Sequence, residues 1–273
     1  MTSRTGAIAI TGASGQVGTV LRRRLGAFPN DVRPLARHGD LAGAFRDAEV
    51  VVHLAGTLRP EPPNTYVEAN LRTVKRTVAA LEGSSVERVV FLSYLGADPA
   101  SSNEYLRTKG LAEELLRNCG RDLVVFRCSH IYGPPAEPGP FDEAFLSKGG
   151  RPVRILGSGR QRIAPVFRED VVEAIVRAAL DPATYHGRYD LTGPETMTVD
   201  EFALALNGGT VTLRHVPPRL VRPLAHVIPG LPPALVEIML ADSVGDRIRA
   251  PRAFGLELRT VADVYRSSRP AAA

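Results

Sequence analysis

A tyrosine and a lysine four positions apart, Tyr105 and Lys109, could exchange a proton with a substrate. We expect a helix over residues 103–118, and this spacing places both side chains on one face of it. A tyrosine phenol, with a reference pKa of about 10, is a poor base near neutrality, and a nearby ammonium group favours the phenolate. Ser93 lies twelve residues before Tyr105, at the expected end of a buried strand. The three side chains could pass a proton to or from a hydroxyl or carbonyl oxygen while a nicotinamide exchanges the hydride.

A tyrosine–lysine pair of this spacing is a surface pair in most proteins, so its meaning depends on the elements around it. Residues 7–18, AIAITGASGQVG, predict an apolar strand, a glycine turn and the first turn of a helix. Gly12 lets the chain turn sharply, Gly15 lets the backbone approach a pyrophosphate, and Gly18 lets the helix pack on the strand. The positive end of that helix favours a phosphate group. We therefore expect a dinucleotide here, and no lysine follows the glycines as it would in a nucleotide triphosphatase loop.

Apolar runs that suit buried strands alternate with amphipathic stretches that suit helices through the first half of the chain. This rhythm predicts an α/β fold with a doubly wound, Rossmann-like parallel sheet and right-handed crossovers. The stretch between Arg37 and Val50 has little room for the third strand of a complete Rossmann half, so that strand is either lost or reduced to a stub. We expect strands over residues 7–11, 32–37, 49–54, 89–93 and 123–127, and helices over residues 16–26, 41–46, 65–81 and 103–118. The apolar face of the helix over 65–81 is expected to hold Val67, Leu71, Val74, Val78 and Leu81.

From residue 134 onward the elements alternate less regularly, and six prolines break residues 216–234 into short pieces. This pattern suits a small C-terminal substrate-binding part with a lid better than a second large core. We expect residues 1–133 to form the dinucleotide-binding domain, with residues 164–193 returning to it. Residues 134–163 and 194–273 then form the substrate-binding or lid portion.

Composition excludes several classes of protein. The chain has 34 basic and 29 acidic residues, with scattered arginines and few aromatics, so a nucleic-acid partner is not expected. Cys119 and Cys128 have neither metal-ligand spacing nor histidine pairs nearby, so no metal site is expected. The N-terminus leads directly into a strand without an apolar signal core, and no apolar run could span a membrane. We therefore expect a cytoplasmic protein without a membrane partner.

Together these segments resemble the short-chain dehydrogenase/reductase (SDR) superfamily, in its extended or atypical NAD(P)-binding epimerase/dehydratase-like branch. The resemblance covers roughly residues 7–205, and its motifs occur in the right order. The matching segments are TGASGQVG at 11–18, HLAG at 53–56, Asn70, FLS at 91–93, YLRTK at 105–109, RCSHIYGPP at 127–135, APVFREDVVEAI at 164–175 and YDLTGPETMTVDEFA at 189–203.

The resemblance implies that Tyr105 is the catalytic acid/base and that Lys109 holds the nicotinamide ribose and tunes Tyr105. It implies that Ser93 binds the reacting oxygen. The remaining implied contacts are with the cofactor: Gly12, Ala13, Ser14, Gly15, Gln16 and Val17 at the pyrophosphate, Leu54, Ala55 and Gly56 beside the adenosine and its ribose, and Ser129, His130 and Ile131 near the nicotinamide.

The function implied is that of an NAD(P)-dependent oxidoreductase, or of an epimerase or dehydratase with a transient hydride transfer, acting on a small hydroxyl or carbonyl substrate. A homodimer is one assembly that would suit it. The alternative is a dinucleotide-binding sensor or assembly subunit without turnover, although such members often lose the tyrosine or the lysine. The end of the second strand decides the dinucleotide. Arg37 lies there without a carboxylate, which favours the 2′-phosphate of NADP, with NAD as the alternative.

Several other polar residues have simpler expected roles. His53, inside an apolar strand, is expected to be a core histidine, whereas His130 could contact cofactor or substrate. Arg127 and Tyr132 are expected to pack the strand end against the C-terminal part. Asp170 is expected to stabilise a helix start. Asp40 could contact adenine or start a helix, and the arginines at 151, 154, 160 and 162 read better as a solvated loop than as a basic pocket.

Overall fold

The computed structural model describes residues 5–61, 63–181, 185–225, 227–228 and 230–266. The chain forms two compact units, each built from two stretches of sequence. Unit 1 comprises Met1–Arg127 and Val171–Tyr189, and unit 2 comprises Cys128–Asp170 and Asp190–Ala273. Compactness alone does not define a domain, so the predicted domain boundaries at residues 133, 163 and 193 stay a prediction.

A six-stranded sheet with the order β10-β5-β4-β3-β1-β2 organises unit 1. β1 pairs in parallel with β2 and β3, and β3 pairs in parallel with β4. The predicted Rossmann-like α/β fold is confirmed. The strands are β1 (Ala7–Thr11), β2 (Val32–Leu35), β3 (Ala48–His53), β4 (Arg88–Tyr94), β5 (Asp122–Cys128) and β10 (Gly187–Leu191).

The sheet lacks the third strand of a complete Rossmann half. Between β2 and β3 the chain forms only the short helix α2 (Leu41–Phe45), so β2 is left at the edge of the sheet. This position explains why Pro34 is tolerated within β2, opposite Ile10 of β1. Proline has no backbone N–H to donate to a neighbouring strand, and an edge strand can leave that position unpaired. Of the two sequence-based alternatives for this strand, the structure shows its loss.

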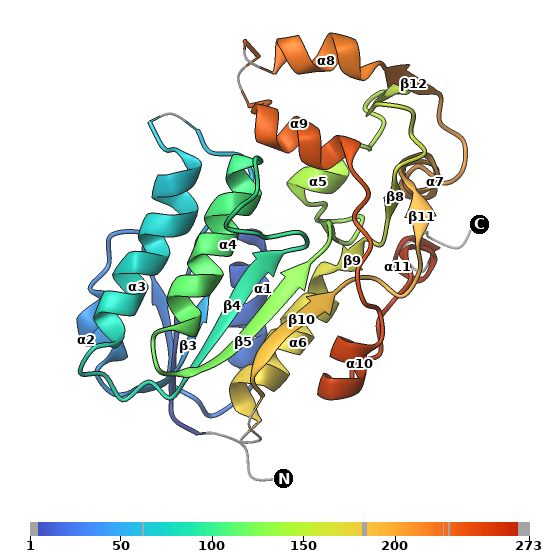
Figure 1. The fold of residues 1–273 in the computed structure, drawn as a ribbon. Helices are drawn as coiled ribbons and strands as arrows, with labels where there is room; N and C mark the ends of the chain where they lie inside the picture. The colour runs from blue at the N-terminus through green and yellow to red at the C-terminus, as the bar shows by residue number, and fades with distance from the viewer. Residues whose placement is uncertain (1–4, 62, 182–184, 226, 229, 267–273) are drawn as a thin grey trace. The chain divides into compact units, whose positions relative to one another are not determined.

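Helices cover both faces of the sheet, which is why its strands are almost continuously apolar. In Figure 1, α2, α3 (Thr73–Leu81) and α4 (Glu104–Arg117) lie on the near face, and α1 (Gln16–Leu25) and α6 (Arg168–Leu180) lie behind it. The near-face core joins buried strand residues such as Val51 and Phe91 to helix residues such as Phe45, Val74 and Leu116.

The single helix predicted over residues 65–81 is two elements. A π-helix, η1 (Val67–Arg72), precedes α3. Each π turn holds more residues than an α turn, so η1 rotates its side chains away from the face that a regular helix would give. Val67, predicted on the apolar face, is 42% exposed, whereas Asn70 is 1% exposed. The prediction of helical structure here is therefore confirmed, and the prediction that Val67 lies on its apolar face is wrong.

Unit 2 consists of short elements around a smaller core of aromatic and aliphatic side chains that includes Phe145, Phe167 and Phe202. Its three two-stranded sheets pair β11 with β8, β12 with β7 and β6 with β9. Prolines begin α8 and α9, where the missing N–H of proline leaves no helical bond unmade. The elements are β6 (Ile131–Tyr132), α5 (Pro140–Glu143), β7 (Val153–Leu156), β8 (Arg162–Ile163), β9 (Val166–Phe167), β11 (Met197–Thr198), α7 (Val199–Leu206), β12 (Leu213–Val216), α8 (Pro218–Leu224), α9 (Pro233–Leu240), α10 (Arg249–Phe254) and α11 (Val261–Arg266).

Within the described part of the chain, none of the helices has both the length and the apolar character needed to cross a membrane.

Candidate functional site

The glycine turn has a geometry that only glycine satisfies at two of its positions. Gly12 has a φ of +68°, and a Cβ atom there would lie 2.6 Å from the backbone nitrogen of Ala55. A Cβ atom on Gly18 would overlap the carbonyl oxygen of Gly12, so α1 can approach β1 only without a side chain there. Gly15 is the N-cap of α1 and residues 14–16 are exposed. With no acidic residue in its first turn, this helix start suits a bound anion.

The segment after β3, expected beside the adenosine ribose, is held by Asn70 of η1. The Asn70 side chain accepts the N–H of Thr57 at 2.8 Å and donates to the Thr57 carbonyl at 3.1 Å. A Cβ atom on Gly56 would lie 2.6 Å from Asn70 Oδ1 and 3.9 Å from Lys109 Nζ. Leu54 continues the contact with the first strand, because its N–H donates to the Thr11 carbonyl. The segment 54–57 therefore lies between the glycine turn and Lys109.

Tyr105 and Lys109 both lie on α4, and both are buried. Lys109 Nζ donates to the carbonyl oxygen of Leu92 at 2.6 Å. The ring of Tyr105 meets the ring of Tyr94 edge-on, with 5.5 Å between their centroids. Leu92 and Tyr94 flank Ser93 in β4. The structure therefore brings the three predicted catalytic residues to one place, the end of β4.

The hydroxyl of Ser93 is engaged by a buried carboxylate. Ser93 Oγ donates to Glu113 Oε1 at 2.6 Å, and Glu113 is 1% exposed. Arg127 donates to the same carboxylate through Nε at 2.9 Å and Nη2 at 2.7 Å. A carboxylate so held only accepts hydrogen bonds, so the Ser93 proton points to Glu113 and the Ser93 oxygen keeps its lone pairs for another donor.

Glu113 is a site residue that the sequence reasoning missed. Its position was a usable signal, because Tyr105, Lys109 and Glu113 repeat every four residues on one helix face. Arg127 was expected to pack toward the C-terminal part. Its guanidinium instead binds Glu113 and the carbonyl of Ala97, both within unit 1.

A third tyrosine, Tyr66, also packs against Tyr105, with 5.9 Å between the ring centroids. The Tyr66 hydroxyl donates to the carbonyl oxygen of Leu58 at 2.9 Å. Burial raises the pKa of Tyr66 above its usual value. Tyr66 is therefore an un-ionised neighbour whose proton is held by the backbone.

His53 is a core histidine, as the sequence predicts. Its Nδ1 lies 3.0 Å from both the Thr11 hydroxyl and the Thr77 hydroxyl. Burial, helped by the nearby charge of Lys109, lowers the pKa of His53 to about 3. The imidazole is therefore neutral at physiological pH, and it ties the end of β1 to α3.

The residues expected near the nicotinamide lie in unit 2. The Ser129 hydroxyl donates to the carbonyl oxygen of Ala164. The ring of His130 stacks on Phe141, with 4.2 Å between centroids and 9° between planes. Burial lowers the pKa of His130 to about 4, so this ring is neutral as well. Ile131 begins β6 and pairs with Val166 of β9.

Arg37 is exposed beyond the end of β2, and its guanidinium donates to Asn64 Oδ1 at 2.6 Å. The next acidic residue, Asp40, starts α2 by accepting the N–H of Gly43 at 3.0 Å. Of the two expected roles for Asp40, the structure shows the helix cap.

The other residues with simpler expected roles lie in unit 2. Tyr132 packs on Phe167, with 5.4 Å between ring centroids. Asp170 lies in the first turn of α6, as expected, and its carboxylate binds the backbone and guanidinium of Arg259.

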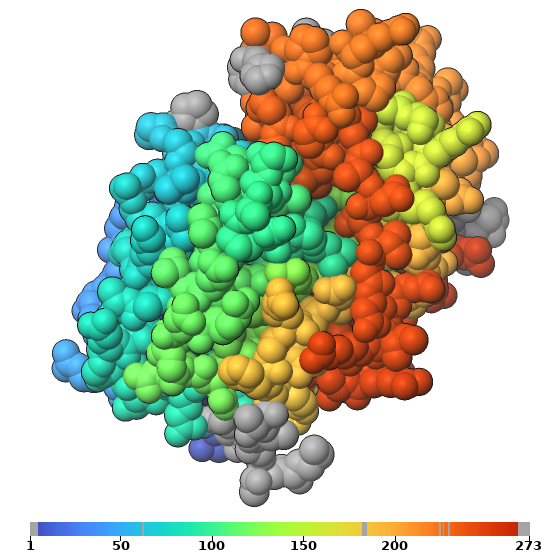
Figure 2. Space-filling model, viewed as in Figure 1, coloured from blue at the N-terminus to red at the C-terminus, as the bar shows by residue number. Residues whose placement is uncertain are grey.

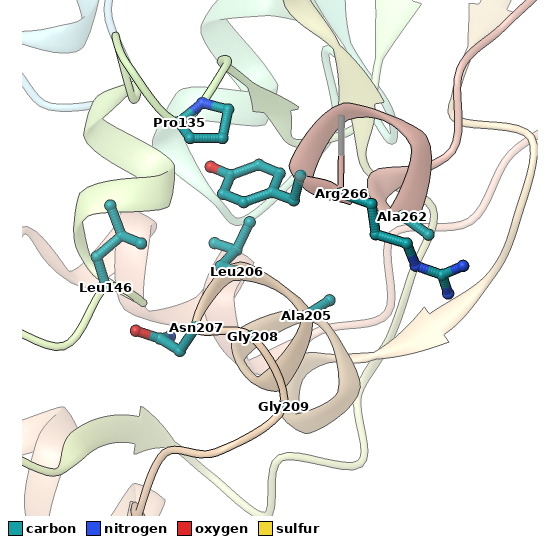
Figure 3. Close-up of a pocket in the computed structure, with 10 residues that line it drawn as sticks. Pro135, Leu146, Ala205, Leu206, Asn207, Gly208, Gly209, Ala262 and Arg266 are labelled. Carbon is teal, nitrogen blue, oxygen red and sulfur yellow. The ribbon is translucent and has the colours of Figure 1, made fainter. Parts of the chain in front are cut away.

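Each unit contains a surface cavity. One of about 480 Å³ in unit 1 is lined by Glu113 and Arg127 among others. One of about 550 Å³ in unit 2 lies between α7 and α11, and Figure 3 shows Pro135, Leu146 and Leu206 around it. Neither cavity is lined by Tyr105.

Comparison with known proteins identifies the family. Residues 8–190 match the model of the NAD dependent epimerase/dehydratase family. The chain is 25% identical over 190 residues to the mitochondrial 40 kDa subunit of NADH-ubiquinone oxidoreductase from Neurospora crassa, covering 68% of this chain and 49% of that protein. It is 31% identical over 192 residues to UDP-glucose 4-epimerase from Mycolicibacterium smegmatis, covering 58% of this chain and 60% of that protein. The chain thus spans about half the length of the curated relatives it matches.

The fold is shared with a solved structure, MoeE5 in complex with UDP-glucuronic acid and NAD. The TM-score is 0.73 at 19% sequence identity, over 95% of this chain and 97% of that chain. The predicted resemblance to the extended SDR branch is confirmed: this chain belongs to the NAD dependent epimerase/dehydratase family.

Proposed function

We propose that this chain is an NAD(P)-dependent oxidoreductase, or an epimerase or dehydratase, that acts on a small hydroxyl or carbonyl substrate through Tyr105, Lys109 and Ser93. The observation that supports it most is the meeting of Tyr105 and Lys109 with the end of β4, in the same unit as the glycine turn. The family match supports the reaction class.

The residues present fit a dinucleotide, because residues 14–16 are exposed at the start of α1 and the first turn of that helix holds no acidic residue that would repel a phosphate. Residues 12–17 would hold the pyrophosphate, residues 54–56 the adenosine ribose, and Ser129, His130 and Ile131 the nicotinamide end. When bound, the nicotinamide supplies or accepts the hydride.

Tyr105 gives a proton to the substrate carbonyl oxygen or takes one from the substrate hydroxyl, at its phenolic oxygen. Lys109, a buried ammonium group on the same helix face, favours the phenolate form of Tyr105 and would bind the nicotinamide ribose. Since the Ser93 proton points to Glu113, Ser93 would accept a hydrogen bond from a substrate hydroxyl at its oxygen. This is the refinement that the geometry adds to its expected role.

The test is turnover with NADP and NADPH on a panel of alcohols and carbonyl compounds that includes UDP-glucose and UDP-glucuronic acid, because two similar proteins carry these sugars in their names. On the best substrate, Tyr105→Phe should lower kcat by about 10²- to 10⁴-fold with unchanged NADP binding. Tyr66→Phe is the matched control, since it removes a hydroxyl from the neighbouring ring, and it should stay within a few-fold of the native enzyme. Full turnover by Tyr105→Phe would contradict the proposal.

We propose NADP as the preferred dinucleotide, although the MoeE5 structure holds NAD. The support is the exposed Arg37 at the end of β2 and the absence of a carboxylate there, because Asp40 caps α2 instead. Arg37→Ala should weaken NADP binding by at least about tenfold and leave NAD binding within a few-fold. Calorimetric titration of both dinucleotides measures this, and tighter binding of NAD than NADP by the native protein would refute the preference.

A second function, a dinucleotide-binding subunit without turnover, is favoured by the similarity to a subunit of NADH-ubiquinone oxidoreductase. Tight NADP binding together with no turnover on the whole panel would support it over the enzyme. The cytoplasmic location and the homodimer stay predictions, and two similar proteins are named as mitochondrial. The four arginines at 151, 154, 160 and 162 are all exposed, as expected of solvated side chains, but Arg154 lies in β7 and Arg162 in β8 and not in a loop.

A further inference from the structure

Six large aliphatic side chains in the described residues are strongly exposed: Val67, Leu220, Val227, Ile228, Val244 and Ile248. Three of them, Leu220, Val227 and Ile228, fall within one stretch that runs from α8 to the start of α9, and their exposed fractions are 54%, 72% and 43%. We call these three residues the hairpin patch. A soluble monomer usually hides clustered aliphatic groups, so such a cluster indicates a surface that meets a partner.

The packing of α8 (Pro218–Leu224) turns Leu220 outward, and Val227 and Ile228 follow this helix. Val221 and Ala225, one helical turn apart, are buried against Val236 of α9. That contact fixes one face of α8 against α9, and Leu220 lies off that face. In Figures 1 and 2 the segment containing α8 forms the outer surface of its unit.

The stretch of sequence that carries the hairpin patch contains arginines and no acidic residue. No aspartate or glutamate occurs between Glu201 and Glu237, whereas that stretch holds three arginines, Arg214, Arg219 and Arg222. Arg222 pairs with Glu237 at 2.8 Å, and Arg214 and Arg219 are exposed. Glu237 therefore offsets the charge of Arg222, and the same stretch adds the positive charges of Arg214 and Arg219 to the three aliphatic side chains.

The other exposed aliphatic residues lack this environment. Val67 is followed by Glu68, and Val244 lies between Asp242 and Asp246. Ile248 lies two residues after Asp246, whose carboxylate accepts the N–H of Ile248 at 2.8 Å. Among the described residues, the exposed large aliphatic side chains that lack an aspartate or glutamate within two positions in the sequence are those of the hairpin patch.

We propose that the hairpin patch binds the surface of an anionic lipid bilayer as a peripheral contact, with its aliphatic side chains in the headgroup region and Arg214 and Arg219 against lipid phosphates. Anionic lipids attract arginines near the surface, and apolar side chains add affinity that depends on their buried area. A second copy of this chain suits the patch less, because a symmetric contact would bring like-charged arginines together. This proposal is an alternative to the expectation of no membrane partner, and it does not depend on the proposed function.

The test is co-sedimentation of the full chain with vesicles of phosphatidylcholine alone and of phosphatidylcholine with phosphatidylglycerol at 3:1. We expect binding to the anionic vesicles only, weakened by high salt. The triple variant Leu220→Ser, Val227→Ser, Ile228→Ser should lower the partition coefficient by at least about tenfold. Arg214→Gln with Arg219→Gln should lower it by about fivefold for each arginine.

The matched control is the double variant Val244→Ser, Ile248→Ser, which removes equally exposed aliphatic groups beside acids and should leave the partition coefficient unchanged. Circular dichroism checks that each variant is folded. If the triple variant does not fold, the two arginine substitutions, which remove no aliphatic side chain, still test the patch. The proposal is overturned if the native chain does not bind anionic vesicles or if the control loses binding as much as the triple variant. Light scattering that shows a dimer dissolved by the triple variant would also overturn it, in favour of a second copy.

Discussion

At the scale of single residues, buried polar side chains and glycines decide what this molecule can do. Glu113 accepts the hydrogen bond of the Ser93 hydroxyl, and Asn70 accepts the backbone N–H of Thr57, next to Gly56. Leaving a buried polar group without its hydrogen-bond partner costs more folding free energy than the hydrogen bond itself contributed. Substitutions at such positions should therefore lower the unfolding free energy far more than substitutions of the exposed residues around them.

Replacing Gly18 with alanine should destabilise the protein by about 1–3 kcal/mol, because the new methyl group would collide with the backbone of the glycine turn. Within a helix the same replacement is normally favourable. Gly26→Ala is the matched control at the other end of α1, where a Cβ atom would make only ordinary contacts at 3.5 Å. Urea unfolding of the two variants measures the difference, and equal stabilities would contradict the collision.

His130 should make the protein less stable in mild acid. Its pKa is lowered to about 4 by burial, so below the ordinary histidine value near 6.5 the unfolded chain takes up a proton that the folded protein does not. The unfolding free energy therefore falls as the pH drops from about 6.5 to about 4, by about 2–3 kcal/mol for this ring.

His130→Phe keeps the stacking on Phe141 and should remove that share of the acid loss. Urea unfolding at both pH values measures it, with the exposed His38→Gln as the control that should change nothing. If the unfolding free energy of His130→Phe falls between the two pH values as much as that of the native protein, this ring does not cause the fall.

At the scale of elements, the π-helix η1 and the loss of one Rossmann strand shape the surroundings of the segment proposed to bind adenosine. Strand β2 is exposed at the sheet edge, and η1 places Asn70 under the segment that follows β3. Extra residues per turn are kept in helices mainly where they serve a site, because their hydrogen bonding is poorer. We therefore expect binding of the adenosine end of the dinucleotide to depend on η1 and on residues 54–57.

Asn70→Ala should weaken NADP binding by at least about tenfold and lower the unfolding free energy by about 1–3 kcal/mol, since two hydrogen bonds to Thr57 are lost in a buried place. Asn70→Asp keeps the acceptor for the Thr57 N–H and loses only the donor, so it should fall between the native protein and the alanine variant. Titration calorimetry and urea unfolding give the two values. Native NADP affinity in Asn70→Ala would exclude this role.

At the scale of the whole molecule, dinucleotide binding and stability are linked. A ligand that binds only the folded chain stabilises it by about 2.7 kcal/mol at one hundred times its Kd. Equal concentrations of NADP and NAD should therefore raise the Tm by different amounts, with the larger rise for NADP. Arg37→Ala should remove the difference without lowering the Tm of the free protein, because Arg37 is exposed. A greater rise with NAD in the native protein would contradict the NADP preference.

The sequence by itself determined the order of strands and helices in unit 1, the glycine turn, and the shared face of Tyr105 and Lys109. These features are local: glycine conformation, apolar periodicity and four-residue spacing act over a few positions and leave a readable pattern. Pro34 is tolerated in β2 because β2 is an edge strand. The sequence alone does not show that position, which follows from the order of strands in the sheet.

Only the tertiary structure decided where the Ser93 proton points, since its acceptor Glu113 comes from α4 and is held in turn by Arg127 of β5. It also decided the π turn at Asn70 and the exposure of the hairpin patch, because side-chain burial depends on neighbours distant in sequence. Short-range pattern fixes the elements, whereas the pairing of buried polar groups and the faces left uncovered follow from long-range packing.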